Sequence, residues 1–558
     1  MFFRAIWWLR FALSWLVEGL RWLVGLRRPY RVLTLNLSGD FPEAPTPAWW
    51  SASQPRSFTE LVTVLRWARL DPLLKAVLLN FEDVHLGWAQ AFELRRSLEQ
   101  LREAGKTVWV SLTAASLPEY VVATAAQKIS LAPAGGVELS GLAAETIFVA
   151  RALEKLGIDP FFVQAGPYKT AAEMFTQTRM SAAHREMAES LIEDLYVQIL
   201  TAVATGRGWS IEQARSTCDR GPFSAAEALE AGLVDSLSYP TEVEEALQKE
   251  VGGEQPAIDF PSYFRRRHRE LRRQAWRYGR AHLALVYVTG PIVLDAHGAL
   301  VPAGAVRLTA LRRTFQMLAK QRDARAVVVR IASPGGSAIA SDLLWHEMQT
   351  VANVKPVVVS MGDVAASGGY YVALAGRPIV AESTTLTGSI GVLSGTFRLR
   401  GLYQWLGIDK DRVERGAHTH LQSDYAPLTE EERAILQRHA DQFYCRFLDL
   451  VAQARDLAPE QLDKAAGGRV WTGRLAASVG LVDAIGGLEY ALDEAKRLAG
   501  YTPVDPVPVA QYPRPKTFWQ SLLAPHRAVP PIPLPPASPL GPRHRRELWA
   551  ILPLRLTI

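Results

Sequence analysis

Short hydrophobic runs along this chain alternate with longer segments in which apolar residues recur at helical spacing. The runs are rich in β-branched residues and leucine, which is typical of buried strands. Helical patterns cover 92–104 and 311–320, and two longer ones cover 182–205 and 430–454. Because strands alternate with helices, the pattern predicts an α/β fold built from parallel βαβ units. The strand-like runs occupy 31–37, 75–80, 107–112, 283–289, 326–331 and 356–361.

The two halves of the chain follow the same sequence plan. The tripeptide Gly-Ile-Asp at 157–159 recurs 250 residues later at 407–409. The run at 76–79 recurs at 326–329 with the same offset, and the run at 231–235 recurs at 479–483 with an offset of 248. The repeat is therefore nearly free of gaps, and it predicts two tandem units of the same fold.

The two copies differ at the positions that carry chemistry. The second copy has Ser367 within Ala-Ser-Gly-Gly-Tyr, where the first copy has Leu117. The first copy has Lys169 within Tyr-Lys-Thr, where the second copy has Thr419. A nucleophile in one half and a base in the other predict a single site, built where the two copies meet.

Length and composition fit several folded domains. The chain has 558 residues, of which 48% are hydrophobic and 21% charged, and single cores stop growing at roughly 250–300 residues. Its two cysteines, Cys218 and Cys445, provide no disulfide framework or zinc cluster. No metal-binding or nucleotide-binding motif is present either, so the sequence implies no cofactor. The predicted divisions are a membrane-surface helix at 1–28, the first repeat at 29–258, a basic linker at 259–282, the second repeat at 283–500 and a proline-rich tail at 501–558.

The first 26 residues form an amphipathic pattern. Arg4, Arg10, Glu18 and Arg21 fall on one side of a helix whose remainder is mainly Trp, Leu, Phe, Ile and Val. These charges make a membrane-spanning helix costly, so we expect the segment to lie on a lipid surface. A helix packed on the protein body is the alternative, and no clear cleavable signal peptide is present.

The net charge of +6 is mild and partly local, because eight arginines crowd the junction of the repeats. A solvated linker helix explains this cluster, and contact with anionic lipid is the alternative. We do not expect nucleic acid as a partner, because no interleaved aromatic residues accompany the arginines. The tail after residue 500 contains proline runs that exclude regular helix, although 519–523 and 548–556 are apolar enough to dock or touch a membrane. The cluster comprises Arg265, Arg266, Arg267, Arg269, Arg272, Arg273, Arg277 and Arg280.

Three polar turns of the second copy follow predicted strands. The first is Ser-Pro-Gly-Gly-Ser at 333–337, the second holds Ser367, and the third is Leu-Thr-Gly-Ser-Ile-Gly at 386–391. A serine at a strand-to-helix turn can expose its hydroxyl while the backbone amides stay free. The amides of Gly336 and Gly368 are therefore candidates for an oxyanion hole.

These three turns, in this order and spacing, resemble the signal peptide peptidase A family (protease IV), in particular its long, internally duplicated bacterial form. The resemblance covers roughly residues 30 to 500 and includes Gly-Pro-Tyr-Lys-Thr-Ala-Ala-Glu at 166–173. It implies tandem ClpP/crotonase-like α/β domains and a serine protease activity. It also implies that Ser367 is the nucleophile, Lys169 the general base, and Ser389 a residue that hydrogen-bonds the lysine.

Physical chemistry sets a condition on this pair. A lysine can activate a serine only when neutral, so burial away from other charges must lower its pKa from about 10.4. Glu173, four residues beyond Lys169, would oppose this if it pointed at the amine, and we expect it to point elsewhere. A histidine base is the alternative within this chemistry, with His346, His418, His420 and His439 as candidates. Asp363, just before the serine turn, is better explained as a turn or cap residue than as a catalytic acid.

Two other functions remain open to the sequence. A crotonase-type acyl-CoA enzyme would share the oxyanion hole but would need no Ser/Lys pair. A non-catalytic membrane scaffold would need neither residue. The favoured prediction is a membrane-associated homo-oligomer, with a tetramer as the guess for its size, that cleaves extended hydrophobic peptides such as signal-peptide remnants beside small or apolar residues. The resemblance places it at the bacterial inner membrane, on the periplasmic face.

Overall fold

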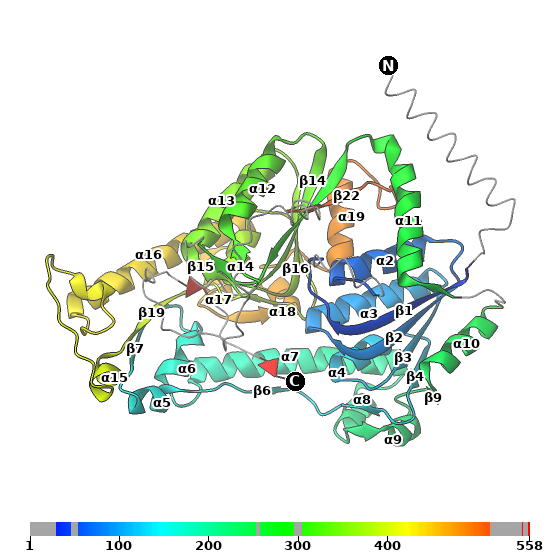
Figure 1. Ribbon diagram of the computed structural model, residues 1–558, viewed down its shortest axis with the longest axis horizontal. Coiled ribbons are helices and arrows are strands. Elements are labelled where there is room, and N and C mark those ends of the chain that lie inside the picture. Colours follow the sequence, from blue (N-terminus) through cyan, green and yellow to red (C-terminus); the bar gives the residue numbers. More distant parts are fainter. Residues whose placement is uncertain are drawn as a thin grey trace, which may run out of the picture.

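The computed structural model describes residues 30–45, 54–252, 257–294, 304–513, 549–550 and 556–557. The predicted helix at 1–28 and most of the proline-rich tail lie outside these residues. Two α/β units are joined by a long antiparallel arm (Figure 1). No helix of the described residues is both long enough and apolar enough to cross a membrane.

The first unit contains a parallel sheet in the order β10-β1-β2-β3-β4-β9. Its strands are buried, as expected for a parallel sheet with both faces covered. Helices α2 (Phe58–Leu70) and α3 (Trp88–Glu103) follow β1 and β2, and α4 (Leu117–Ala123) follows β3. The strands are β1 (Val32–Asp40), β2 (Ala76–His85), β3 (Thr107–Leu112), β4 (Lys128–Leu131), β9 (Ser236–Leu237) and β10 (Ile258–Asp259).

The second unit repeats this plan in the order β20-β18-β16-β14-β11-β22, with β17 and β21 attached to β16. Helices α12 (Leu308–Lys320), α13 (Ala338–Ala352), α14 (Gly368–Ala373) and α19 (Leu488–Leu498) accompany it. Strand β22 shows that this unit reaches beyond residue 500, where the sequence places its end. Proline runs begin only later, so the chain can still pair there. The strands are β11 (His282–Thr289), β14 (Ala324–Ser333), β16 (Val357–Ala366), β17 (Ile379–Ala381), β18 (Leu386–Gly388), β20 (Val470–Thr472), β21 (Ala484–Ile485) and β22 (Val509–Tyr512).

Matching contacts confirm the duplication. The guanidinium of Arg207 pairs with Asp235 in the first unit, and Arg455 pairs with Asp483 at the equivalent place in the second. Short strands also pair in the same way in the two units. Strand β5 (Gly136–Val137) pairs antiparallel with β8 (Phe223–Ser224), as β18 pairs with β20. The α/β class and the tandem repeat predicted from the sequence are therefore both confirmed.

An arm of the first unit reaches across the second. Strand β7 (Asp159–Ala165) pairs antiparallel with β19 (Val392–Arg398) over seven residue pairs. Helices α5 (Ala150–Lys155), α6 (Glu173–Thr176) and α7 (Ala182–Arg207) belong to the same arm. Met187, Ala188 and Leu191 of α7 form one apolar cluster with Leu386 and Val470 of the second unit. The equivalent arm of the second unit contains α15 (Arg400–Trp405) and α16 (Glu430–Arg455).

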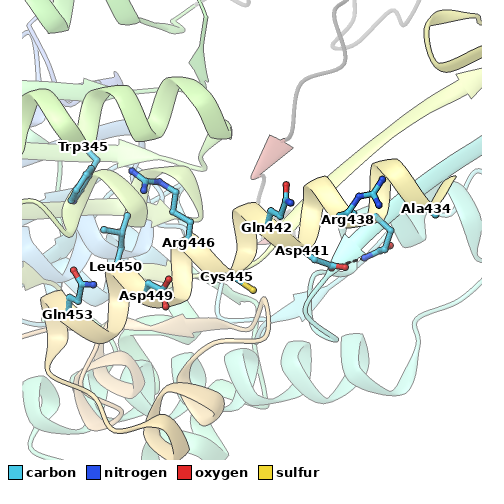
Figure 2. A pocket seen from close by; sticks show the side chains of 11 residues that line it. Trp345, Ala434, Arg438, Asp441, Gln442, Cys445, Arg446, Asp449, Leu450 and Gln453 are labelled. Carbon is cyan, nitrogen blue, oxygen red and sulfur yellow. Dashed lines mark hydrogen bonds between the residues drawn. The ribbon is translucent and has the colours of Figure 1, made fainter. Parts of the chain in front are cut away.

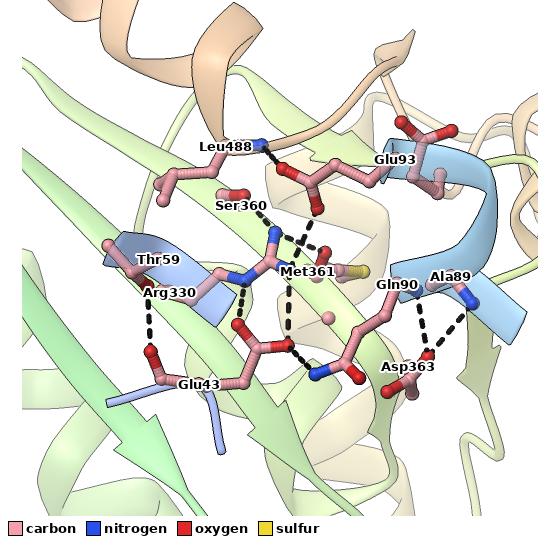
Figure 3. A network of polar contacts seen from close by, with 12 residues as sticks. Glu43, Thr59, Ala89, Gln90, Glu93, Arg330, Ser360, Met361, Asp363 and Leu488 are labelled. Atoms are coloured by element: carbon pink, nitrogen blue, oxygen red, sulfur yellow. Dashed lines mark hydrogen bonds and ion pairs between the residues drawn. The ribbon is translucent and has the colours of Figure 1, made fainter. Parts of the chain in front are cut away.

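A buried charge network also joins the units (Figure 3). Arg330 of β14 is fully buried and binds Glu43 and Glu93 of the first unit, at 2.9 Å in each case. Its guanidinium also donates to Ser360 Oγ and to the Met361 carbonyl, both on β16. Burial, in the presence of further carboxylates, raises the pKa of Glu93 to about 7.

Asp363 adds a second polar link between the units. Its Oδ1 accepts hydrogen bonds from the Ala89 and Gln90 amides, at 2.8 Å and 3.1 Å, and so caps helix α3 of the first unit (Figure 3). The N-cap residue of α3 is Gly87, which has no side chain to cap the helix itself. The prediction that Asp363 is a cap residue is confirmed, and the helix that it caps belongs to the other repeat.

The basic junction of the repeats is helix α11 (Phe260–Gln274). The helix packs on the first unit through Phe260 and the fully buried Tyr263, so it is not a free linker. Arg266 lies over the Tyr30 ring at 4.4 Å, whereas Arg265, Arg269 and Arg272 are exposed. The junction therefore combines a docked apolar face with an exposed basic one.

Candidate active site

Ser367 stands at the turn between β16 and α14 and is fully buried. Its backbone has φ 55° and ψ −115°, a conformation that is costly for a residue with a side chain. The Ser367 amide donates to the Gly388 carbonyl at 2.8 Å, which helps to hold the turn.

Lys169 follows strand β7 and is also fully buried. The neighbouring Tyr168 amide donates to the Gly467 carbonyl of the second unit at 2.8 Å. A Cβ atom at Gly468 would lie 2.5 Å from the Lys169 backbone nitrogen, so only glycine allows this close approach. The pair Gly467-Gly468 escaped the sequence analysis. A comparison of the two copies could have found this pair, because the equivalent positions of the first copy hold Asp219 and Arg220, so the two glycines occur in the second copy alone.

The structure brings the predicted residues together within one chain. Lys169 Nζ lies 2.6 Å from Ser367 Oγ and 2.8 Å from Ser389 Oγ. The ammonium group also donates to the Ser389 carbonyl at 3.1 Å. Ser389 has a positive φ of 52°, so two residues of the site have unusual backbone angles. The pair can therefore form without a second subunit.

Burial lowers the pKa of Lys169 to about 7. Desolvation is the cause, because removal from water disfavours the charged ammonium form. Glu173 does not contact the amine. It accepts from the Ser181 amide, and its Oε2 lies 3.0 Å from His184 Nδ1, as expected for a carboxylate that points away from the lysine. The amine can therefore be neutral near neutral pH.

The two glycine amides proposed for an oxyanion hole lie side by side. A Cβ atom built at Gly368 would lie 3.2 Å from the Gly336 backbone nitrogen. Gly336 itself has φ 151°, and a Cβ there would lie 2.1 Å from the Ile292 carbonyl oxygen, so a side chain is excluded. The turn at 335–336 thus lies close to the start of α14, as a two-amide oxyanion hole would require.

Beside this site, one sheet has a position for a single strand between two strands that do not pair with each other. Strand β15 (Gly336–Ser337) and strand β19 belong to one sheet but do not pair with each other. Strand β23 (Trp549–Ala550), near the C-terminus, lies between them and pairs antiparallel with both. Its backbone is opposite Gly336, the residue with the candidate oxyanion amide. An extended peptide backbone can therefore be held at this position by strands on both sides.

The histidine alternatives lie in other surroundings. His420 Nδ1 is 2.9 Å from the Pro427 carbonyl, and His418 Nε2 is 3.8 Å from Glu431. Among the described residues, the side-chain hydrogen bond of Ser367 is to Lys169, not to a histidine. No group of three or more residues able to bind a metal occurs in the described part of the chain. The base nearest the serine is therefore the lysine.

A hollow of about 870 Å³ lies along α16, away from these residues (Figure 2). It is lined mostly by polar side chains of that helix, together with Ala434 and Leu450, and by Trp345 of α13. The exposed Cys445 belongs to this lining, whereas Cys218 is buried. Neither Ser367 nor Lys169 lines the hollow, so it is separate from the candidate site.

A buried serine with a positive φ, within hydrogen-bond distance of a buried amine, is an arrangement that suits a serine hydrolase. The chain belongs to peptidase family S49. The model of that family, described as "Peptidase family S49", matches residues 100–253 and 349–502, once in each repeat. The predicted resemblance to signal peptide peptidase A in its long, duplicated form is thereby confirmed.

Relatives support this assignment over most of the chain. "Serine protease SPPA, chloroplastic" from Arabidopsis thaliana is 32% identical over 498 residues, which cover 88% of this chain and 73% of that protein. "Protease 4" from Salmonella typhi is 32% identical over 461 residues, covering 80% and 72% of the two chains. A ClpP1 structure from Listeria monocytogenes, at 15% identity, covers 37% of this chain and 94% of its own with a TM-score of 0.26. That likeness is too slight to bear on the fold, which the sheets themselves define.

Proposed function

We propose that this protein is a membrane-associated endopeptidase in which Ser367 is the nucleophile and Lys169 the general base. The observation that carries the proposal is the 2.6 Å separation of Lys169 Nζ and Ser367 Oγ, with both side chains fully buried. A lysine with a pKa of about 7 is partly neutral at neutral pH, and a neutral amine can accept the serine proton. Ser389 orients the amine by a hydrogen bond that adds no charge.

The reaction proceeds through an acyl-enzyme. Ser367 Oγ attacks the carbonyl carbon of the scissile peptide bond while its proton passes to Lys169 Nζ. The negative charge that develops on the carbonyl oxygen is stabilised by the Gly336 and Gly368 amides. The ammonium of Lys169 then protonates the leaving amine as the C–N bond breaks. A water molecule, deprotonated by the same lysine, hydrolyses the ester and regenerates Ser367.

The slot between β15 and β19 supports an extended peptide as substrate. Strand β23 pairs there with Gly336 on one side and with Leu393 on the other. A substrate that binds in the same way gains main-chain hydrogen bonds from both walls, whatever its sequence. Val392 and Leu393 are buried apolar wall residues, which favours hydrophobic peptides such as signal-peptide remnants. We expect small or apolar residues beside the bond that is cut.

An activity-directed serine probe tests the chemistry. We expect covalent labelling at Ser367 in the unaltered protein and loss of labelling in Lys169→Ala. The matched control is Lys155→Ala, which removes an exposed lysine of the same arm and should leave labelling unchanged. Equal labelling of Lys169→Ala and the unaltered protein would overturn the proposed role of the lysine. Profiling of a mixed peptide library tests the substrate, and a preference for charged residues at the scissile bond would contradict it.

The proposed site of action is a membrane surface, on the periplasmic face of a bacterial inner membrane. Two features support it. The amphipathic segment 1–26 suits a helix in the lipid interface, and α11 presents exposed arginines that attract anionic head groups. Deletion of residues 1–26 should release active protein from the membrane fraction. Retention of the truncated protein through high-salt washing would assign the anchor to another segment.

A further inference from the structure

Residues 467–472 of the second repeat lie directly against the loop that carries the base. We call them the bridging segment. The Tyr168 amide donates a hydrogen bond to the Gly467 carbonyl at 2.8 Å. A Cβ atom at Gly468 would lie 2.8 Å from Lys169 Cβ, so the two backbones are in direct contact. A shift of the bridging segment relative to the first repeat would therefore change the space around the lysine side chain.

The bridging segment also holds the backbone of the two serines. The Arg469 carbonyl accepts a hydrogen bond from the Ser389 amide at 2.7 Å. Strand β20, which is part of the segment, pairs with β18, and β18 ends at Gly388. The Gly388 carbonyl in turn accepts from the Ser367 amide at 2.8 Å. The base and both serines are therefore held relative to one stretch of backbone.

A buried carboxylate of the first repeat fixes one end of the bridging segment. Asp194 of α7 is 4% exposed, and its Oδ2 accepts a hydrogen bond from Thr472 Oγ1 at 2.6 Å. Its Oδ1 accepts from Arg474 Nε at 2.8 Å, and Gln198 Nε2 donates to Oδ2 at 2.7 Å. Hydrogen bonds to an ionised group are stronger than those between neutral groups. Asp194 therefore links α7 firmly to β20.

Arg469 links the middle of the bridging segment to the same helix. Its Nη1 donates to Glu186 Oε1 of α7 at 2.7 Å. The other oxygen of Glu186 accepts from the Tyr168 hydroxyl at 3.0 Å. The guanidinium also lies 5.1 Å from the centroid of the Tyr168 ring and 4.7 Å from that of Trp471. The residue that precedes the base is thus linked to the segment through its side chain as well as its backbone.

The charges of both links accompany the lysine. Helices α7 and α16 begin 248 residues apart, as do strands β8 and β20, so the two copies align with this offset here. With the same offset, Asp194 corresponds to Gln442, and Arg469 corresponds to Gly221. The carboxylate and the guanidinium are therefore present at the junction that contains the base, and uncharged residues stand at the equivalent positions.

We propose that Asp194 and Arg469 are positioning residues for the peptidase reaction. They hold the bridging segment on the first repeat, so that the Lys169 amine stays against the two serines and away from water. This inference rests on the proposed role of Lys169 as the general base. The hydrogen bonds of the amine go to the two serines, so both positioning residues act through the segment. A supporting shell of this kind fixes the contact that proton transfer requires.

Acylation by a serine-directed probe, measured as a function of pH, tests this role. The midpoint for the unaltered protein should lie near the lysine pKa of about 7. Asp194→Ala should admit water to the amine, so the midpoint should rise by about one unit and the rate at neutral pH should fall about fivefold. Asp194→Asn, which keeps an oxygen for Thr472, should lie between the two. The control Glu193→Ala removes an exposed carboxylate beside Asp194 on α7 and should change neither quantity.

Arg469→Gln gives a second test at a position where no buried carboxylate loses its partner, because the Glu186 side chain is 56% exposed. Its midpoint should also rise. Desolvation, not a neighbouring charge, lowers the lysine pKa, so this rise would report water and not the lost cation. Rates are divided by the folded fraction from circular dichroism. A midpoint that stays unchanged in Arg469→Gln, or in folded Asp194→Ala or Asp194→Asn, would leave these residues with a purely structural role and refute the proposal.

Failure of the proposed function would look different. If Lys169→Ala acylated as fast as the unaltered protein at every pH, the lysine would not be the base, and the positioning role would fall with it. If Lys169→Ala is slow and the variants of the two positioning residues keep the midpoint of the unaltered protein, only the positioning role is lost. The two ideas are therefore tested separately by one set of pH profiles.

Discussion

The two repeats share one fold but hold their equivalent turns differently. In the first repeat, Leu117 begins helix α4 and is not among the residues with positive φ; the preceding N-cap residue, Ser116, has φ −71°, and its amide donates to Glu119 Oε2 at 2.7 Å. In the second repeat, Ser367 occupies the position of Leu117 with φ 55° and no side-chain cap. The unusual backbone therefore occurs in the repeat that carries the proposed nucleophile and not at Leu117. The difference indicates that the turn costs stability, which the first repeat has recovered with an ordinary helix cap.

The base position shows the reverse contrast. Lys169 follows a paired strand and is clamped by Gly467 and Gly468 of the other repeat. Thr419, its counterpart, follows an unpaired segment, and its hydroxyl donates to Glu414 at the surface. The same local sequence plan thus gives a buried amine in one case and an exposed turn in the other. Contact with the neighbouring repeat makes the difference.

The largest expected effect comes from the serine itself. Ser367→Ala should reduce peptide cleavage by about 10³-fold or more, because no acyl-enzyme can form. The reciprocal change, Leu117→Ser, should create no activity in the first repeat, since that turn is relaxed and faces no lysine. Steady-state cleavage of a peptide substrate by the two variants measures both effects. Activity of a Leu117→Ser, Ser367→Ala double variant would show that the two turns are interchangeable.

Removal of the base should have a similar but smaller effect. Lys169→Ala should lower the rate constant for acylation by about 10²–10⁴-fold, the usual contribution of a general base. Thr419→Lys in the same protein should not restore it, because that turn lies away from Ser367. Rapid-mixing measurement of probe acylation reports this step directly. Full acylation by Lys169→Ala would indicate that a histidine or water serves as the base.

The pH dependence should follow the same lysine. Because its pKa is lowered to about 7, the neutral form increases as pH rises through 7, and the acylation rate should rise with it. The rate should level off well below pH 10, where an ordinary exposed lysine would still be titrating. A pH profile of probe acylation between pH 5 and 11 tests this. A rise centred near pH 10 would show that burial does not lower the lysine pKa.

The buried network of Arg330, Glu43 and Glu93 should affect the free energy of unfolding and not the rate of peptide cleavage. Arg330→Met should lower the free energy of unfolding by about 3–5 kcal/mol, because Glu43 and Glu93 would be left buried without their partner. The corresponding residue of the first repeat is Asn80, which bonds Asn36 and carries no charge. Asn80→Ala should therefore cost less. Urea unfolding of both variants gives the comparison, and equal losses would contradict a special role for the inter-repeat network.

The smallest expected effect is on the pH dependence of stability, through Glu93 of the same network. The pKa of Glu93 is raised to about 7 in the folded protein, so folding favours its protonated form. Its contribution to stability is therefore largest at low pH and is lost as pH rises from about 4.5 through 7. Glu93→Gln should flatten this slope in unfolding measurements. An unchanged slope in Glu93→Gln would assign the pH dependence to other groups, such as Asp363, whose pKa is raised to about 6 by burial.

The sequence by itself determined the strands, the helices and the duplication, because these depend on local patterns of apolar residues. The helix expected at 182–205 is α7, which ends at Arg207, and the helix expected at 430–454 is α16, which ends at Arg455. Both predictions therefore agree with the structure to within two residues. The sequence also singled out Ser367 and Lys169, each present in one copy only, and the family resemblance added Ser389; the structure brings the three side chains together. Gly336 and Gly368 followed from their places after predicted strands.

Only the tertiary structure decided how these residues meet. No local pattern shows that β7 crosses to β19, that Asp363 caps a helix of the other repeat, or that Arg330 lies between two distant glutamates. Lys169 is buried against residues of the other repeat, among them Gly468, almost 300 residues along the chain, and this burial lowers its pKa. Local sequence sets conformation over a few residues. Desolvation and the distance between a base and its nucleophile depend on residues that only the folded chain brings together.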